Sequence, residues 1–352
     1  MNVLFATNHA YPPQHVGGSE ASTHDLCLTL REIGIEVAVL SSLRHGRQRG
    51  RGFRRDEVFG YPVFRAANPA AAATEVVRDV APDVAVIQAG RPLALAERFT
   101  ALALPCVVYL RDAQFDTLGR SDVELPGVRY LATSRDLARR FSEAFGILPE
   151  QIPPLARPER YRVVSSRQNV TFVCPHPMKG VDIALGLAAR RRDIPFVFLE
   201  SWQLPRVHRL VLNGRVKAAP NITYRGRTGD MRTIYGSAKV VLVPSRWPEA
   251  WGRVVSEAQV SGIPALASNH GGLPESVGSG GILVDPDAGL EHWERALARI
   301  WDDEAEYDRL AGLAREHAAR PDFQPDAIAA KLLAVLESEV GSRHVPKHPH
   351  AP

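Results

Sequence analysis

Two glutamates, Glu249 and Glu257, stand eight positions apart in the segment 244–262, PSRWPEAWGRVVSEAQVSG. An apolar run ends at Pro244 and a helix begins near Gly252, so Glu249 lies in the loop and Glu257 about a turn and a half inside the helix. The two carboxylates can therefore hold opposite ends of one ligand, and the free amides at the helix start point at the same place. A plainer interpretation is two solvated glutamates, but the neighbours of Glu257 on this helix are mainly apolar.

A second place for chemistry is the loop 9–20, HAYPPQHVGGSE, in which Gly17 and Gly18 precede a helix. The unpaired amides and the dipole of a helix start favour an anion, and glycines let it approach the backbone. The third glycine of the GxGxxG fingerprint is missing, so a nicotinamide site is not indicated. A glycine turn that only joins strand to helix is the alternative.

Short apolar, β-branched runs alternate with helical stretches along the first half of the chain. Such runs are typical of strands buried on both faces, as in a parallel sheet. Between the first two runs, Leu26, Leu30 and Ile33 recur at helical spacing over 19–33, and Gly34 ends the helix. We expect strands at 2–7, 36–41, 83–88, 106–110 and 128–133.

The same alternation resumes after a stretch rich in proline and charge. We predict a Rossmann-like domain over 1–155, a linker over 156–168 and a second Rossmann-like domain over 169–324. A helix over 325–340 can return to the first domain, and the tail 341–352 is expected to be disordered. In the second domain we expect strands at 169–174, 195–200, 221–224, 239–244, 263–268 and 281–284, and helices at 182–191, 231–238, 252–261 and 290–318.

Composition is that of a globular protein. Of its 352 residues, 45% are hydrophobic and 23% are charged, with a formal net charge of +4; this balance excludes disordered, fibrous and disulfide-stapled classes. Cys27, Cys106 and Cys174 lie far apart among apolar neighbours, so no disulfide framework or metal knuckle is indicated. Neither a signal peptide nor a membrane-length apolar run is recognisable, and we expect a cytoplasmic protein.

Around the two glutamates the chain resembles a known family. EAWGRVVSE is preceded by NITYRGRTGDMRTIYGSAKVVLVPSRWP and followed by SGIPALAS and GGLPESVG. Together with GGSE near the start and HPMKGVDIAL at 176–185, this series resembles the retaining glycosyltransferases of family 4. The resemblance extends over nearly the whole chain. It implies an α/β protein of the GT-B fold, with two tandem Rossmann-like, doubly wound parallel-sheet domains facing across a cleft.

The resemblance also implies a role for each matching residue. Lys179 would neutralise the departing diphosphate, Glu249 would contact the transferred sugar and Glu257 would hold the ribose hydroxyls. The implied catalytic residues are Glu249, Lys179 and Asp112, and the implied acceptor-binding residues are His9 and Arg111. The implied donor-binding residues are Gly17, Gly18, Lys179, Arg225, Gly226, Arg227, Glu249, Trp251, Gly252, Arg253, Val254 and Glu257.

Two positions depart from the family pattern. Many relatives carry Gly-Arg shortly before the phosphate-binding lysine, whereas Cys-Pro-His stands here at 174–176, and Arg246 or Arg253 is considered as the missing cation. Many relatives also place a histidine after the strand corresponding to 106–110, where this chain has Arg-Asp at 111–112. Trp247 and Trp251, which flank Glu249 in the sequence, can pack beneath the loop or stack on a sugar.

The leading hypothesis is a retaining, metal-independent glycosyltransferase. It would move a sugar from a nucleotide-diphosphate sugar, a UDP- or GDP-sugar, to a hydroxyl of a glycan, a lipid-linked glycan or a small metabolite. No metal or cofactor is expected, because lysine, arginine and helix N-termini can share the charge of the leaving diphosphate. The alternatives are a non-catalytic nucleotide-sugar-binding relative and a GT-B sugar-nucleotide epimerase.

Six arginines crowd the segment 44–55, RHGRQRGRGFRR. We interpret it as a solvated loop; the alternative is an arm that contacts anionic lipid at the inner membrane face, or a phosphorylated acceptor. Nucleic acid is not expected as a partner, because Phe53 is the only interleaved aromatic residue. The histidines of the N-terminal domain lack HxxxH or HExxH spacing, so a metal site is not expected there.

Overall fold

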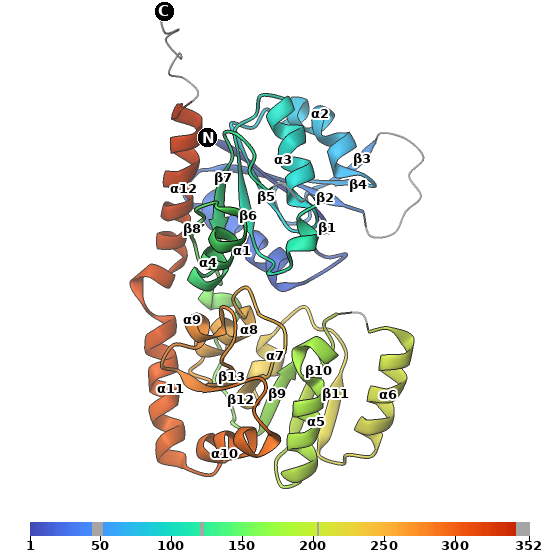
Figure 1. The fold of residues 1–352 in the computed structure, drawn as a ribbon, viewed down its shortest axis with the longest axis vertical. Helices are drawn as coiled ribbons and strands as arrows, with labels where there is room; N and C mark the ends of the chain where they lie inside the picture. The colour runs from blue at the N-terminus through green and yellow to red at the C-terminus, as the bar shows by residue number, and fades with distance from the viewer. Residues whose placement is uncertain (44–51, 120–122, 203, 343–352) are drawn as a thin grey trace, which may run out of the picture. The chain divides into compact units, whose positions relative to one another are not determined.

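The structure, a computed structural model, describes residues 1–43, 52–119, 123–202 and 204–342. Contacts divide the chain into two compact units (Figure 1). Unit 1 comprises Met1–Leu155 and Pro325–Pro352, and unit 2 comprises Ala156–Gln324. Most of the predicted tail, 343–352, and most of the arginine-rich segment, 44–51, lie outside the described residues.

Unit 1 is built on a sheet whose described strands are β1 (Asn2–Ala10), β2 (Glu36–Ser42), β3 (Phe53–Asp56), β4 (Val63–Ala66), β5 (Val84–Gln88), β6 (Cys106–Leu110), β7 (Arg129–Ala132) and β8 (Glu150–Gln151). Their order is β3-β4-β2-β1-β5-β6-β7-β8. Neighbouring strands are parallel except β3, which runs antiparallel to β4. The chain builds one side of the sheet from β1 and then crosses to β5, so the order reverses between these two strands.

The five strands predicted for the first half are all present within a few residues of the expected bounds. β5 and β6 are buried at every position, as expected for apolar strands covered on both faces. The prediction of a loop over 44–55 is wrong at its end, where Phe53–Asp56 forms β3. The physical reason lies in β4: the buried guanidinium of Arg65 donates to Asp56 at 2.6 Å, and Phe64 packs edge-on against Phe53.

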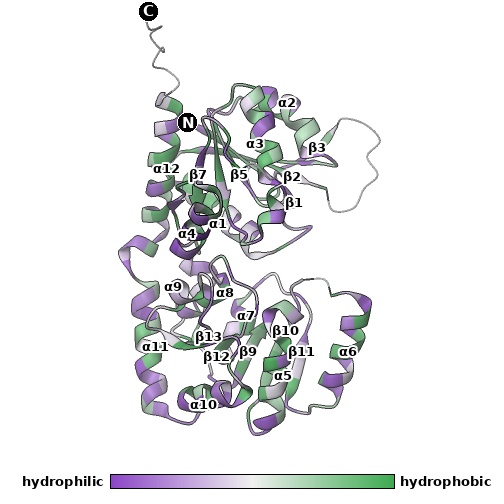
Figure 2. Ribbon diagram, viewed as in Figure 1, coloured by the Kyte–Doolittle hydropathy of each residue, from purple (hydrophilic) through white to green (hydrophobic). Residues whose placement is uncertain are grey.

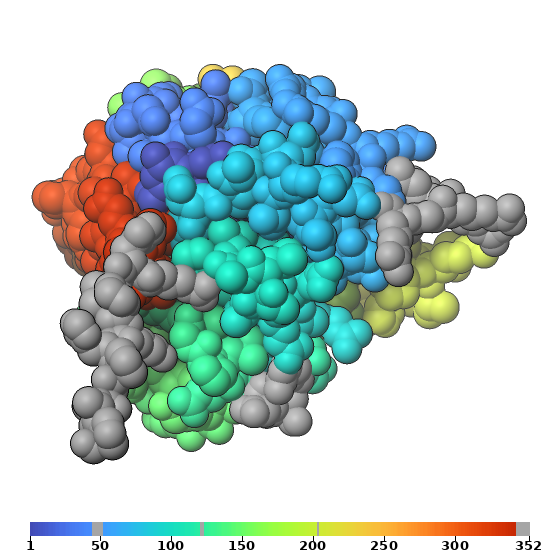
Figure 3. Space-filling view, turned by 90° about the horizontal axis from the view of Figure 1, so that it is seen from above, coloured from blue at the N-terminus to red at the C-terminus, as the bar shows by residue number. Residues whose placement is uncertain are grey.

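The helices of unit 1 include one from the far end of the sequence. α12 (Pro325–Ser342) buries Ile328, Leu332 and Leu336 in the same apolar cluster as Leu26 and Leu30 of α1 (Gly18–Glu32). The red helix accordingly lies against blue N-terminal segments in Figure 3. The remaining described helices of this unit, which the sequence analysis did not specify, are α2 (Pro69–Val80), α3 (Pro92–Ala101) and α4 (Arg135–Phe145).

Unit 2 is built on a parallel sheet whose described strands are β9 (Asn169–Val173), β10 (Phe196–Leu199), β11 (Ile222–Arg225), β12 (Ala238–Val243), β13 (Ala265–Ser268) and β14 (Gly281–Val284). Their order is β11-β10-β9-β12-β13-β14. The chain adds strands on one side of β9 as far as β11 and then crosses to β12 on the other side, so the strand order reverses between β9 and β12. In open α/β sheets, ligands bind outside the carboxyl ends of the strands at such a reversal.

The described helices of unit 2 are α5 (Val181–Arg190), α6 (Arg206–Lys217), α7 (Arg232–Tyr235), α8 (Arg253–Gln259), α9 (Leu273–Val277), α10 (Leu290–Trp301) and α11 (Glu304–Ala318). The prediction of one helix over 290–318 is wrong, because α10 ends at Trp301 and α11 begins at Glu304. Asp303 adopts an extended conformation, and its side chain accepts a hydrogen bond from the amide of Glu306. This N-cap starts a new helix where apolar periodicity alone suggests continuity.

The segment predicted as a linker, 156–168, packs on unit 2. Tyr161 is buried in an apolar cluster with Tyr235, Val255 and Ala258, and the amide of Val163 donates to Ser261 Oγ at 2.9 Å. A stretch rich in proline and charge can thus be fixed by a single large aromatic side chain. Among the described helices, none is both long and apolar enough to cross a membrane.

Candidate functional site

Lys179 stands in the loop that follows the central strand β9. The ring of His176 accepts a hydrogen bond from the amide of Met178 at 3.2 Å and so caps the short helical turn Pro177–Lys179. Gly180 follows with φ of +74°, and a Cβ on it would lie 1.9 Å from the carbonyl oxygen of Pro244. Only glycine allows the loops after β9 and β12 to approach this closely.

Glu249 stands in the loop after β12, directly across the reversal of strand order from Lys179. The ammonium Nζ of Lys179 lies 2.6 Å from Glu249 Oε1, and the hydroxyl of Ser245 donates to the same oxygen. The two charged side chains are 14% and 15% exposed, so each retains access to a ligand. Lys179 Nζ also lies 4.6 Å from the ring centroid of Trp202. The arrangement offers a cation and a carboxylate to the same small volume.

Backbone hydrogen bonds hold the loop of Glu249 from two sides. The amides of Arg246 and Trp247 donate to the carbonyl oxygen of Met178, each at 3.1 Å. The amide of Gly272 donates to the carbonyl oxygen of Glu249 at 2.7 Å. The stretch GGLP at 271–274 therefore positions the backbone of Glu249.

Glu257 belongs to a second, buried cluster on α8. Arg253 Nε donates to its Oε1 at 2.7 Å, and the hydroxyl of Tyr235 donates to its Oε2 at 2.8 Å. The guanidinium also donates to the hydroxyl of Tyr161 at 2.6 Å. Burial, followed by the charge of Glu257, raises the pKa of Tyr235 well above its usual value, which keeps the phenol a neutral donor. A carboxylate has about four acceptor positions, so Glu257 can accept two further hydrogen bonds from a ligand.

Two residues at the start of α8 are held by packing contacts. Trp251 is buried: its Nε1 donates to Ser256 Oγ at 2.9 Å and its ring packs edge-on against Phe323. Packing, and not sugar stacking, is its role in this structure. Gly252 has a φ of +94°, and a Cβ on it would lie 2.4 Å from Leu273 Cδ2. The glycine is therefore needed for the close contact with Leu273 of α9 on the side where its Cβ would lie.

Residues 225–227 lie at the same carboxyl edge of the sheet. Arg225 ends β11, and Gly226 and Arg227 follow it as exposed residues. Arg227 lies 3.6 Å from the carboxylate of Glu200, which follows β10. β11 is two positions from β9 in the sheet, so this loop is separated from that of Lys179 by about 10 Å at the usual strand spacing. A nucleotide-sized ligand can span that distance.

In unit 1, two histidines lie beside the buried Glu20. His9 Nδ1 lies 3.2 Å from Glu20 Oε1, and His15 Nε2 lies 3.9 Å from Oε2. The hydrogen bond to Glu20 raises the pKa of His9, although burial lowers it. The negative charges of Glu20 and Asp112 also raise it. Burial raises the pKa of Glu20, but the hydrogen bond and charge of His9 prevail and lower it overall. The pair therefore favours its charged form.

The helix start predicted to bind an anion is already approached by Glu20. A Cβ on Gly17, the residue before α1, would lie 2.5 Å from Glu20 Oε2. Arg111 stacks 4.1 Å from the ring centroid of Tyr109 and donates to the carbonyl oxygen of Ser19 at 3.3 Å. Gly17, Gly18, His9, Arg111 and Asp112 therefore lie in one region of unit 1. Their assignment to donor and acceptor stays a prediction.

The arginines considered as replacements for the missing cation have carboxylate partners. Arg246 Nη2 lies 2.6 Å from Asp182 Oδ2, and Arg253 is bound to Glu257 as described above. Either arginine would have to exchange its carboxylate partner to reach a phosphate, as Lys179 would have to leave Glu249. Sequence reasoning missed Ser245, Tyr235, Glu20 and Trp202 because no spacing links them to the residues that they contact.

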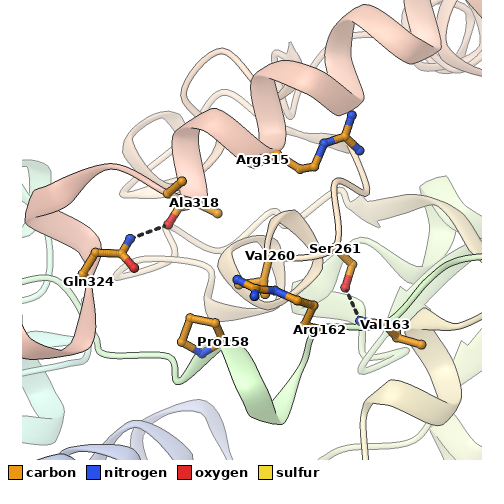
Figure 4. Close-up of a pocket in the computed structure, with 9 residues that line it drawn as sticks. Pro158, Arg162, Val163, Val260, Ser261, Arg315, Ala318 and Gln324 are labelled. Carbon is orange, nitrogen blue, oxygen red and sulfur yellow. Dashed lines mark hydrogen bonds between the residues drawn. The ribbon is translucent and has the colours of Figure 1, made fainter.

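A pocket of about 340 Å³ lies elsewhere in unit 2, between the ends of α8 and α11 (Figure 4). Figure 4 shows Ser261 Oγ bound to the amide of Val163, and Gln324 Nε2 bound to the carbonyl oxygen of Ala318, on its two sides. None of the predicted site residues lines it. In the described parts of the chain, no group of three or more His, Cys, Asp or Glu side chains is arranged to hold a metal ion.

The part of unit 2 that contains Lys179 and Glu249 is similar to a known protein family. Residues 176–317 match the model of the family described as glycosyl transferases group 1. These residues are therefore similar to a group 1 glycosyltransferase domain. The domain runs from His176, beside Lys179, to the end of α11, and it contains Glu249, Glu257 and the loop 225–227.

The curated relatives match the same kind of domain over part of their length. A segment of 123 residues is 36% identical to the D-inositol 3-phosphate glycosyltransferase of Corynebacterium glutamicum, covering 34% of this chain and 28% of the relative. The enzyme of the same name from Corynebacterium diphtheriae is 40% identical over 30% of this chain and 24% of its own length. The matched part thus spans about a quarter of the length of these relatives.

Solved structures extend the likeness to the whole chain. HepE from Anabaena, crystallised with UDP-glucose, superposes with a TM-score of 0.79 at 18% identity, covering 96% of this chain and 100% of that one. Sucrose-phosphate synthase from Thermosynechococcus elongatus gives 0.78 at 16% identity, covering 97% and 99%. At these identities the likeness concerns the fold. The residues that match the family model thus lie in the second of the two Rossmann-like units of a GT-B fold, as the sequence predicted.

Proposed function

We propose that this protein is a retaining, metal-independent glycosyltransferase that transfers a sugar from a nucleotide-diphosphate sugar to a hydroxyl of an acceptor. The observation that carries the proposal is the Lys179–Glu249 contact of 2.6 Å at the reversal of strand order, inside the group 1 domain. The UDP, and UDP-glucose, bound in the HepE structures support a UDP-sugar as the first donor to test.

Each member of the pair has a defined task in this reaction. As the bond between the sugar and the diphosphate breaks, negative charge develops on the diphosphate, and Lys179 would stabilise it in a partly desolvated site. Glu249 would accept hydrogen bonds from the sugar hydroxyls and orient the ring. Donor binding would transfer Lys179 from the carboxylate to the diphosphate. Glu257, Gly252–Val254 and the loop 225–227 would hold the nucleoside and phosphate parts of the donor.

The proposal includes retention of the anomeric configuration and independence of a metal ion. The acceptor hydroxyl would attack on the face from which the diphosphate leaves, and its proton would pass to a phosphate oxygen of the leaving group. His9 and Arg111 would contact the acceptor, and Asp112 would influence the charge of His9. Lys179 and the helix N-termini would balance the diphosphate charge without a divalent cation.

The first experiment is thermal unfolding of the full chain with UDP-, GDP-, ADP- and dTDP-sugars, each with and without EDTA. A ligand at 100 times its dissociation constant adds about 2.7 kcal/mol to the free energy of unfolding. We expect a shift with one nucleotide that EDTA does not remove. A shift that requires a divalent cation would contradict metal independence.

A turnover assay separates transfer from mere binding. With the donor found above, acceptors carrying free hydroxyls are supplied, among them an inositol phosphate because the curated relatives bear that name. The anomeric configuration of the product is read by NMR. An inverted product would contradict retention. Donor binding without transfer or donor hydrolysis, across a broad acceptor panel, would favour the non-catalytic alternative.

A further inference from the structure

Helix α6 is exposed on almost all of its surface. Along Arg206–Lys217 only Leu212 is buried, while Val207, Leu210 and Val211 are 70%, 72% and 55% exposed. Figure 2 shows hydrophobic and hydrophilic residues interspersed along this helix. Three large apolar side chains in water on one short helix are unusual, because such groups gain free energy when they are covered.

The exposed apolar side chains form one stripe that points away from the protein. At about 100° per residue, Val207, Leu210 and Val211 fall within about 100° of one another on the helix surface. Leu212, which anchors the helix to unit 2, lies about 150° from the middle of this stripe. The apolar stripe is therefore on the outer face of α6, opposite the core.

Positive charge surrounds the stripe. On the same helical projection, Arg206 and Lys217 flank one side of the stripe and Arg215 flanks the other. The wider segment 201–229 contains no Asp or Glu. Its basic side chains are Arg206, Arg209, Arg215, Lys217, Arg225 and Arg227. The charge complementary to this surface is negative.

We propose that α6 docks this protein on an anionic lipid bilayer. The stripe Val207, Leu210 and Val211 enters the boundary between headgroups and acyl chains, and the flanking cations bind the headgroup phosphates. A narrow apolar stripe bordered by basic side chains on both sides fits a planar interface that is apolar below and anionic above. This surface is distinct from the arginine-rich segment 44–55.

The docking helix is in contact with the candidate site of unit 2. The ring of His208 on α6 lies 6.4 Å from that of His176, which caps the turn ending at Lys179. The ring of His176 also lies 5.7 Å from that of Trp202, over which Lys179 is placed. Docking through α6 would hold the Lys179 edge of unit 2 near the lipid surface.

The test is flotation of the full chain with vesicles, which requires no turnover and so is independent of the proposed function. Vesicles of phosphatidylcholine containing phosphatidylglycerol are compared with vesicles of phosphatidylcholine alone. We expect binding to the anionic vesicles, and a loss of at least about tenfold in the triple variant Val207→Ser/Leu210→Ser/Val211→Ser. The matched control, Val58→Ser/Leu148→Ser/Val164→Ser, removes three apolar side chains elsewhere that are 65%, 85% and 93% exposed, and it should bind as the parent does.

A second variant tests the charge. Arg206→Gln/Lys217→Gln should weaken binding about tenfold, whereas the exposed pair Arg78→Gln/Arg295→Gln should change it little. Circular dichroism and thermal unfolding establish that each variant is folded. Equal binding to neutral vesicles, unchanged binding of the triple variant, or no vesicle binding by the parent would overturn the proposal. A dimer that the triple variant converts to a monomer, without vesicle binding, would assign the stripe to a second copy of the chain instead.

Discussion

Lys179 Nζ and Glu249 Oε1 lie 2.6 Å apart although 70 residues separate them in the sequence. They meet because β9 and β12 are neighbours at the point where the strand order of unit 2 reverses. Unit 1 has the corresponding feature between β1 and β5, where a Cβ on Gly90 would lie 2.7 Å from Cδ2 of His9. In both units, side chains that can do chemistry stand beside the reversal, where no crossover helix covers the carboxyl edge.

Loss of Lys179 is expected to weaken donor binding. Hydrogen bonds to a charged group are worth about 1.5–3 kcal/mol, so Lys179→Ala should raise the dissociation constant of the donor on the order of tenfold to a hundredfold. Isothermal titration with the donor identified by thermal unfolding measures this. The control is Arg190→Ala, which removes an exposed cation paired with Glu294 on the same unit. Equal losses in both variants would contradict a specific role for Lys179.

Loss of Glu249 is expected to affect turnover more than binding. Glu249→Ala removes the carboxylate that orients the sugar but leaves Lys179 without its resident partner. We expect kcat to fall on the order of a hundredfold or more while the donor dissociation constant changes by less than about tenfold. Steady-state kinetics and titration of one preparation give both numbers. Unchanged transfer would remove Glu249 from the reaction.

Glu257 is expected to contribute to the free energy of unfolding, in addition to any contact with the donor. Glu257→Ala leaves the guanidinium of Arg253 buried with one partner fewer, and breaking a buried ion pair costs about 3–5 kcal/mol. Denaturant unfolding without ligand measures this cost. The double variant Arg253→Met/Glu257→Leu should recover much of it because no buried charge remains unpaired. A stable single variant with weak donor binding would mean that Glu257 serves the ligand alone.

Gly180 is expected to be irreplaceable. Gly180→Ala places a methyl group on the carbonyl oxygen of Pro244 and forces a side chain into a positive-φ conformation, and we expect a loss of about 2 kcal/mol or more. The matched control is Gly312→Ala in the middle of α11, where a Cβ would meet nothing within 4 Å. That change should stabilise the protein by about 0.5–1 kcal/mol. Chemical denaturation of the two variants tests both signs.

The His9–Glu20 pair gives stability a defined pH dependence. The pKa of His9 is raised from 6.5 in the folded protein, so its contribution is complete below about pH 6.5 and is lost as pH rises through the folded value. The pKa of Glu20 is lowered from 4.5, so its contribution is complete above about pH 4.5 and is lost as pH falls through the folded value. The pair therefore stabilises most between these limits. Glu20→Gln should lower the pKa of His9 in an NMR titration, whereas Glu36→Gln at the opposite edge of the sheet should not.

The sequence by itself determined the central strands and the presence of two similar units. β5 and β6 are apolar at nearly every position, and such runs are stable only when a sheet is covered on both faces. The sequence also suggested a helix over 325–340 that can return to the first domain, and α12 spans Pro325–Ser342 in unit 1. It buries Ile328 and Leu332 on one face, a periodicity that is visible without any tertiary information. Family resemblance then named Lys179 and Glu249, but not their contact.

Only the tertiary structure decided which of the named residues are available to a ligand. In the sequence, Trp251 and Glu257 both lie near a helix start, and the sequence does not show which of the two side chains is available to a ligand. Trp251 packs against Phe323, and Glu257 accepts hydrogen bonds from Arg253 and Tyr235. The exposed stripe of α6 could not be recognised for the same reason. Apolar spacing predicts a buried face, and only packing shows that the core covers Leu212 and the half-buried Val216 but not the stripe. Periodicity specifies a face, whereas long-range contacts decide what covers it.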